Sequence, residues 1–259
     1  MITIKITENE AGQRLDRFLK KYLKRAPLSM LYKMIRKDIK INGRRGKEDT
    51  VLCTGDELTF YISEEKLREL LAPVRRKPIK RQFKIIYEDE NILVAGKPWG
   101  LLTHGDSHEK KNTLVNQVCG YLQEKGEYDP LRERSFSPAP VNRLDRNTTG
   151  LVLFGKTAEA LRVLTKAIRE RSNVKKYYLT IVSGFFGEPM KIEGRILKDS
   201  ESNTVNIPDD TYAEEEKRGK ISYTIVRPVA QGKEFSMVEA ELITGRTHQI
   251  KIGREIGRA

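Results

Sequence analysis

The sequence contains the tetrapeptide Arg-Leu-Asp-Arg twice, at residues 14–17 and 143–146. Each copy sets one carboxylate between two arginines, which suits either charge pairing or chemistry on a substrate that carries phosphates. The second copy continues into Asn-Thr-Thr-Gly and then the apolar run 151–154. Asp145 is therefore predicted to lie in a polar loop that enters a buried strand.

Such a loop can hold the Asp145 carboxylate rigidly and half out of water, with the hydroxyl groups of Thr148 and Thr149 nearby. The guanidinium groups of Arg143 and Arg146 would keep it ionised and attract a phosphodiester. A structural alternative is an aspartate that caps a turn. The local pattern by itself favours that alternative.

The first copy has a different context, because apolar residues recur after it with helical spacing. Leu15, Phe18, Leu19 and Tyr22 form one stripe and predict an amphipathic helix. Asp16 then lies at the helix start, where the helix dipole favours a negative charge. A structural or RNA-contacting role is predicted for Asp16, and Arg14, Arg17 and Lys20 are predicted to face solvent or RNA phosphates.

The charge of the chain is uneven. The formal net charge of the 259 residues is +13, and residues 1–82 hold 21 Lys and Arg against 11 Asp and Glu. A basic N-terminal part joined to a nearly balanced larger part indicates a polyanion-binding module, with nucleic acid as the first candidate. Two cysteines are too few for a disulfide framework, and no signal peptide or membrane span is predicted, so a cytoplasmic protein is expected.

Three regions are predicted along the chain. Residues 1–64 indicate a small basic domain with a strand, two helices (the second capped by Ser29) and short strands joined by tight turns. Residues 65–82 are charged, contain two prolines and are interpreted as a linker that can include one short helix. Residues 83–259 are predicted to form an α+β domain with a mixed, mainly antiparallel sheet, because few of its strands are separated by regular helices.

Four segments of the larger region resemble the RluA family of RNA pseudouridine synthases. "VNRLDRNTTGLVLFGKT" is similar to the family signature, in which an aspartate follows Arg-Leu and precedes a Thr-Ser-Gly-like turn. "IIYEDENILVAGKPWGLLTH" resembles its opening hairpin with a Lys-Pro-x-Gly turn, "KYYLTIVSG" a tyrosine-bearing strand, and "LITGRTHQIKI" a later motif. Residues 12–62 resemble the S-four type RNA-binding domain. Together these segments span nearly the whole chain.

The resemblance implies the fold of the pseudouridine synthases and the isomerisation of specific uridines in structured RNA, with ribosomal RNA favoured over transfer RNA. One positioned carboxylate suffices, either as nucleophile or as general base, and no cofactor or metal is implied. By position, Asp145 is the catalytic residue, Arg143 displaces the target nucleotide, and Tyr178 stacks on the extruded uracil. A shift of one residue would exchange Tyr178 with Tyr177.

Further site residues follow from the last motif. Lys251 stands where the family has an arginine that pairs with the catalytic carboxylate, and it is predicted to take that role with less precise geometry. Arg246 and Gln249 are predicted to contact the substrate, as are Thr148 and Thr149 of the Asp145 loop. His104, Asp106 and His108 alternate like metal ligands, but spacing on a polar loop favours no metal site.

Two departures from the family pattern bear on activity. Asn142 replaces the usual histidine, so a hydrogen bond remains available there while a titrating group does not. The family pattern continues beyond the last motif, so the resemblance implies a catalytic domain that is shortened at its C-terminus. A non-catalytic RNA-binding or ribosome-assembly protein therefore stays open as an alternative. A uridine-specific glycosidase is disfavoured, because hydrolysis usually needs a second carboxylate. A monomer is expected.

Overall fold

The computed structural model describes residues 1–71, 80–170, 174–198, 205–206, 220–246 and 249–250. They belong to two compact units, Met1–Glu170 and Arg171–Ala259. The strands that pair in these residues do so antiparallel, in agreement with the predicted α+β class. No helix in the described ranges is long and apolar enough to cross a membrane.

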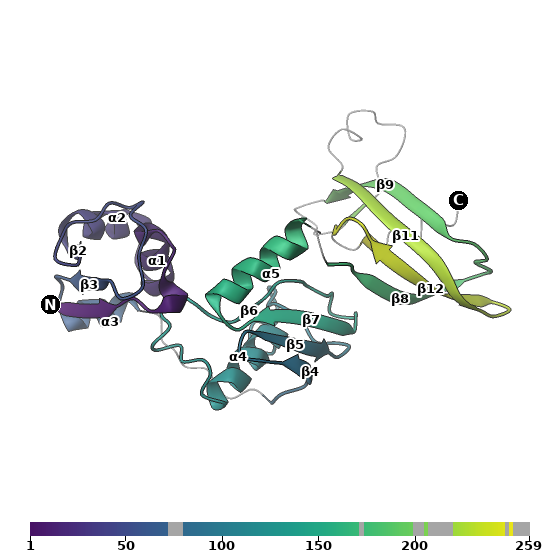
Figure 1. Cartoon of the computed structure of the whole chain (residues 1–259), viewed down its shortest axis with the longest axis horizontal. Helices are drawn as coiled ribbons and strands as arrows, with labels where there is room; N and C mark the ends of the chain where they lie inside the picture. The colour runs from purple at the N-terminus through teal and green to yellow at the C-terminus, as the bar shows by residue number, and fades with distance from the viewer. Residues whose placement is uncertain (72–79, 171–173, 199–204, 207–219, 247–248, 251–259) are drawn as a thin grey trace. The chain divides into compact units, whose positions relative to one another are not determined.

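The N-terminal part of the first unit is a small helical layer on a three-stranded sheet, drawn in purple and blue in Figure 1. The sheet has the order β1-β3-β2, and the predicted stripe on α1 is confirmed, because Leu15, Phe18 and Leu19 are buried in its core. The elements are β1 (Ile2–Lys5), η1 (Glu8–Glu10), α1 (Leu15–Tyr22), α2 (Leu28–Lys37), β2 (Ile39–Ile41), β3 (Glu57–Phe60) and α3 (Glu64–Leu70).

Two boundaries in this part differ from the prediction. Helix α2 begins at Leu28 with Pro27 in the capping position, where a proline loses no backbone hydrogen bond, so Ser29 is not the cap. Helix α3 begins at Glu64 and is the short helix that the sequence allowed in the region interpreted as a linker, but it packs on the N-terminal core. Leu67 and Leu70 are buried in the N-terminal core. They are three residues apart, as on one face of a helix, but the charged residues around them obscure this pattern in the sequence. The compact core therefore extends to α3.

A seam of polar contacts joins η1 to residues 133–135 within the first unit. The buried carboxylate of Glu10 accepts hydrogen bonds from the backbone amides of Arg134 (2.7 Å) and Ser135 (3.3 Å) and pairs with the Arg134 guanidinium at 3.4 Å. Burial raises the pKa of the neighbouring Glu133 to about 7, although a hydrogen bond from Asn9 opposes the shift. These contacts explain why the N-terminal part belongs to the same compact unit as residues 80–170.

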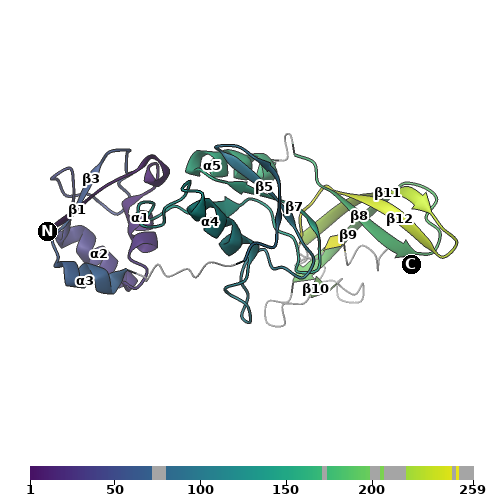
Figure 2. The ribbon, with the colours of Figure 1, turned by 90° about the horizontal axis from the view of Figure 1, so that it is seen from below.

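The remainder of the first unit is a four-stranded sheet of order β4-β5-β7-β6. Alternate residues of β5 and β7 are buried, and Figures 1 and 2 show α4 against this sheet. Gly155 ends β7 where α5 crosses closely, since an added Cβ would lie 2.7 Å from the Leu161 backbone. The elements are β4 (Lys84–Glu88), β5 (Ile92–Lys97), α4 (Leu114–Glu124), β6 (Ala139–Pro140), β7 (Gly150–Gly155) and α5 (Ala158–Glu170).

The second unit is an antiparallel sheet of order β10-β9-β11-β12-β8, drawn in green and yellow in Figure 1. Side chains alternate between its two faces, and β11 carries an irregularity between Pro228 and Ala230. The tyrosine-bearing strand predicted from "KYYLTIVSG" is confirmed as β8. The strands of this sheet are β8 (Tyr177–Ser183), β9 (Met190–Lys198), β10 (Val205–Asn206), β11 (Lys220–Gln231) and β12 (Phe235–Leu242).

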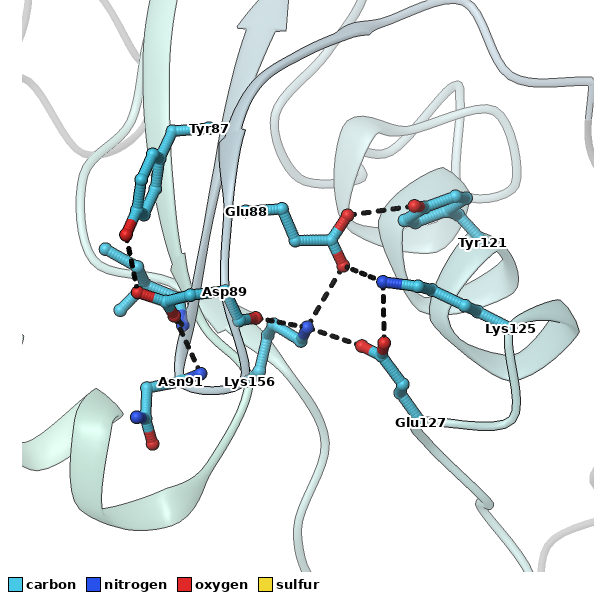
Figure 3. A network of polar contacts seen from close by, with 9 residues as sticks. Tyr87, Glu88, Asp89, Asn91, Tyr121, Lys125, Glu127 and Lys156 are labelled. Carbon is cyan, nitrogen blue, oxygen red and sulfur yellow. Dashed lines mark hydrogen bonds and ion pairs between the residues drawn. The ribbon is translucent and has the colours of Figure 1, made fainter.

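A partly buried charge network ties one end of the four-stranded sheet to α4 (Figure 3). The Lys156 ammonium group, just after β7, pairs with Glu88 at 3.0 Å and with Glu127. Tyr121 and Lys125 donate to the same Glu88 carboxylate at 2.8 and 3.1 Å. Burial would raise the pKa of Glu88, but the hydrogen bonds from Lys156, Tyr121 and Lys125 outweigh it and lower that pKa. Lys156 and Lys125 both pair with Glu88 and Glu127, and Lys156 is the more buried of the two lysines.

Replacing Lys156 by methionine is expected to lower the free energy of unfolding by about 3 kcal/mol, because it leaves the Glu88 carboxylate short of a buried partner. Urea denaturation followed by circular dichroism measures the change. Lys166→Met, on the exposed side of α5, is the matched control and should change stability by less than about 0.5 kcal/mol. Equal stabilities of the two variants would contradict the role given to the network.

Candidate active site

Asp145 lies in the loop between β6 and β7, at the end of the sheet where β5 finishes and β7 begins. Its side chain is half-buried, and its carbonyl accepts a hydrogen bond from the Thr148 amide at 3.1 Å. Thr148 is half-buried as well, whereas Thr149 is exposed. The predicted polar turn that enters a buried strand is confirmed.

Both neighbours of Asp145 are fixed by residues far away in the sequence. The buried Thr103 hydroxyl donates to the Leu144 carbonyl at 2.8 Å and accepts from the Leu144 amide at 3.3 Å. On the other side, the Arg146 carbonyl accepts from the Gly100 amide and from the Lys97 ammonium group, each at 3.0 Å. A loop residue held on both flanks loses little freedom when a substrate binds, as a catalytic group requires.

Lys97 is the buried cation of this site. The residue is 2% exposed, and its ammonium group also donates to the Pro98 carbonyl at 2.9 Å. Burial lowers the pKa of Lys97, while the negative charge of Asp145 acts in the opposite direction. The two side chains are therefore electrostatic neighbours, and an adjacent positive charge favours an ionised carboxylate.

The start and the end of the loop are also anchored on β7. The Asn142 side chain donates to the Leu151 carbonyl at 3.0 Å and accepts from the Leu153 amide at 2.9 Å, which confirms that an amide there can hydrogen-bond. Gly150 has a φ of 133°, a conformation that side chains disfavour, and it pairs with Lys97 in the β5–β7 ladder. The loop is thus attached to both strands of the pair.

The two arginines of the second tetrapeptide are exposed. Arg146 approaches Asp106 at 3.8 Å, and Arg143 lies close enough to His104 to lower the pKa of that imidazole, together with the larger effect of burial. The loop that carries the alternating His104, Asp106 and His108 therefore faces the arginines. In the described ranges, no group of three His, Cys, Asp or Glu residues could hold a metal ion.

Four of the predicted site residues come from the second unit. Tyr178 is half-buried on β8 and Tyr177 is 49% exposed on the opposite face, so the predicted alternation is confirmed. Arg246 donates to the Ile221 carbonyl at 3.0 Å. The buried Gln249 side chain donates to Tyr223 and Thr224 and accepts from Thr244, and so braces the turn after β12. Lys251 lies outside the described residues, and the roles of all four in catalysis or binding stay predictions.

The first tetrapeptide has a different geometry. The Asp16 carboxylate accepts both hydrogen bonds of the Arg14 guanidinium, at 3.0 and 3.1 Å, and a third from the Arg17 amide at 2.8 Å. This carboxylate is saturated by local partners at the start of α1. Arg17 and Lys20 are exposed on the same helix, whereas the charge of Arg14 is partly neutralised by Asp16.

The fold is α+β, and the loop between β6 and β7 places the Asp145 carboxylate between two arginines. This arrangement is compatible with an enzyme that acts on a phosphate-bearing polymer. Residues 91–254 match the family model described as RNA pseudouridylate synthase. The match covers more than half of the chain, so the chain belongs to this family, and the enzyme class is that of an isomerase. The resemblance seen in the sequence motifs is confirmed.

Relatives and solved structures agree with this assignment. The chain is 32% identical over 253 residues to ribosomal large subunit pseudouridine synthase C of Escherichia coli K12, covering 96% of this chain and 74% of that protein. The corresponding protein of Vibrio vulnificus is 33% identical over the same shares. The fold is similar to human RNA pseudouridylate synthase domain containing 1, with a TM-score of 0.52 and 21% identity over 68% of this chain and 66% of that one.

Two residues of the site were not predicted from the sequence, Lys97 and Thr103. Side chains of β5 alternate between a buried and a half-buried face, and Lys97 lies on the buried face with Leu93 and Ala95. Apolar residues normally occupy such positions. The Lys-Pro turn is the signal that could have found it, but that motif by itself indicates only a hairpin. Thr103 gives no comparable signal, because its partner Leu144 is 41 residues away.

Replacing Lys97 by methionine is expected to reduce pseudouridine formation by about 10- to 100-fold, because the flank of Asp145 loses its anchor and the carboxylate shifts. The carbonyls of Pro98 and Arg146 lose a donor, which should also cost about 2 kcal/mol of stability. Single-turnover rates at a temperature where the variant is folded test this. Lys84→Met on the exposed face of β4 is the control, and equal rates in both variants would refute the role.

Proposed function

We propose that this protein converts specific uridines of large-subunit ribosomal RNA into pseudouridine, with Asp145 as the catalytic carboxylate. The observation that carries the proposal is the anchoring of both neighbours of Asp145, Leu144 by Thr103 and Arg146 by Lys97. The names of relatives that share about a third of its residues support ribosomal RNA over transfer RNA. We place this activity in the cytoplasm and assign it to a monomer.

The reaction needs little beyond a positioned carboxylate. The glycosidic bond between C1′ and N1 breaks, the uracil turns, and C1′ bonds to C5. The C5 proton leaves and N1 gains a proton, so the product is an isomer of the substrate. Asp145 acts either as a nucleophile or by taking a proton from the sugar, and the loop geometry is compatible with both. Lys97 supplies a positive charge beside the carboxylate in either case.

Recognition is divided among several parts of the chain. Arg143 is exposed next to the Asp145 loop and can occupy the place of an extruded nucleotide, as base-flipping enzymes require. The family motifs also imply catalytic or substrate-binding roles for Tyr178, Arg246, Gln249 and Lys251. The N-terminal domain of residues 1–64, taken as S-four-like and extended by α3, docks the RNA through exposed basic residues of α1.

Asp145→Asn is expected to lower pseudouridine formation by a factor of about 100 or more while leaving RNA binding intact. The chain provides its own control in Asp16→Asn, the same change in the same tetrapeptide, which should retain activity. Pseudouridine is mapped in ribosomal RNA from cells that lack the gene, after complementation with each variant.

Rescue by Asp145→Asn would refute the proposed catalytic role. If even the wild-type protein restores no pseudouridine but still binds RNA, the alternative of a non-catalytic RNA-binding or assembly protein is the correct one. These two outcomes are distinct. In the first, pseudouridine is present in the strain complemented with Asp145→Asn, and in the second it is absent from every complemented strain.

Arg17→Gln together with Lys20→Gln is expected to weaken RNA binding and to lower its dependence on salt. For every phosphate that the protein no longer neutralises, the slope of log affinity against log salt should fall by about 0.7 to 0.9. The control is Lys66→Gln with Arg68→Gln, which removes the same charge from α3, where both side chains already pair with glutamates. Equal slopes for the two double variants would show that α1 is not the docking surface.

A further inference from the structure

The turn after β5 displays an aromatic side chain beside the Asp145 loop. Trp99 is the single tryptophan of the chain, and it is 69% exposed. Single exposed aliphatic residues are common on protein surfaces, but a tryptophan exposes a large apolar ring and is mostly buried in folded proteins. An exposed tryptophan next to a catalytic loop therefore points to a binding partner.

The backbone on both sides of Trp99 is fixed to the residue that follows Asp145. The Gly100 amide donates to the Arg146 carbonyl at 3.0 Å, and the Lys97 ammonium group joins the Pro98 and Arg146 carbonyls. Gly100 has a φ of 82°, which a residue with a side chain rarely adopts, and Pro98 has a restricted φ. The indole is thus carried on a rigid turn, which lowers the entropic cost of engaging a ligand.

The charges around this turn identify the chemistry of the ligand. Arg143 and Arg146 are exposed on the Asp145 loop. Arg146 approaches Asp106, and the loop that carries Asp106 also exposes Lys110 and Lys111. A flat apolar ring among cationic side chains matches single-stranded RNA, whose bases stack on aromatic rings while its phosphates pair with basic groups. The same arrangement does not match duplex RNA, because paired bases offer no free face.

We propose that Trp99 is a stacking site for an unpaired base of the RNA, next to the nucleotide that reaches Asp145. The inference rests on the proposed function and goes beyond it. It assigns to Trp99, which takes no part in the reaction, a contact with the nucleotide next to the target uridine. Holding that neighbour fixes the strand on one side of the target. The site then favours uridines in loops over uridines in helices.

The single tryptophan permits a direct test in the full chain. The Asp145→Asn variant is titrated with a synthetic RNA hairpin that has a uridine-rich loop, and with a duplex of equal length. Anisotropy of a label on the RNA gives occupancy, and tryptophan emission reports on residue 99 alone. Emission should be quenched by the hairpin and remain unchanged with the duplex at equal occupancy. Unchanged emission on the saturated hairpin would overturn the proposal.

Substitutions give a second readout with the otherwise wild-type protein. Trp99→Ala should weaken hairpin binding by about 5- to 100-fold and raise KM far more than it lowers kcat, since the residue touches no reacting atom. Trp99→Phe, which keeps a stacking ring, should recover most of the affinity. Tyr87→Ala is the control, because this exposed aromatic on β4 lies opposite Val94, away from the Asp145 end of the sheet.

The outcomes separate this inference from the proposed function. If Trp99→Ala binds the hairpin as tightly as Trp99→Phe, stacking is refuted, while pseudouridine formation by the wild type still stands. If the wild type forms no pseudouridine but its emission is quenched by the hairpin, the stacking site stands and the proposed function fails.

Discussion

The buried ammonium group of Lys97 is the constraint on which the site depends. It lies at the last position of β5, opposite Gly150 at the first position of β7, and so at the point where the sheet releases the Asp145 loop. One side chain there joins the turn after β5 to the residue after Asp145. A charge in this position is costly to bury, and the two carbonyls and the nearby carboxylate offset that cost. Loop, turn and strand end are consequently one rigid piece.

A second buried lysine, Lys156, closes the other end of the same strand pair. It pairs with Glu88 of β4 and with Glu127 after α4, so a buried ammonium group lies at each end of the β5–β7 pair. Between them the strands contribute apolar side chains such as Leu93 and Phe154, which are fully buried. The buried apolar face already specifies the register of the two strands, and a buried cation adds to that specification because it has few acceptable positions. The two lysines thus help to define where the Asp145 loop begins.

The sequence predicted those features that depend on neighbouring residues. The helical stripe from Leu15 to Tyr22, the polar turn at Asp145 and the alternation of Tyr177 and Tyr178 all follow from local periodicity. It did not predict contacts across long separations, such as Thr103 with Leu144 or Lys97 with Arg146. It also missed the packing of α3, because an apolar pair among charges resembles a linker until its partner surface is known. The roles assigned to residues of the second unit rest on family motifs.

Asn142 has a consequence for the edge of the sheet. Strand β6 is only two residues long, yet the side chain of Asn142 offers β7 the same donor and acceptor that a further peptide unit would offer. It works as a peptide mimic, so the main chain can turn away toward Asp145 while the hydrogen bonds of β7 remain satisfied. An imidazole in this position would exchange protons near neutral pH, but an amide does not. The edge of β7 is therefore hydrogen-bonded by an amide group, whose donor and acceptor do not change with pH.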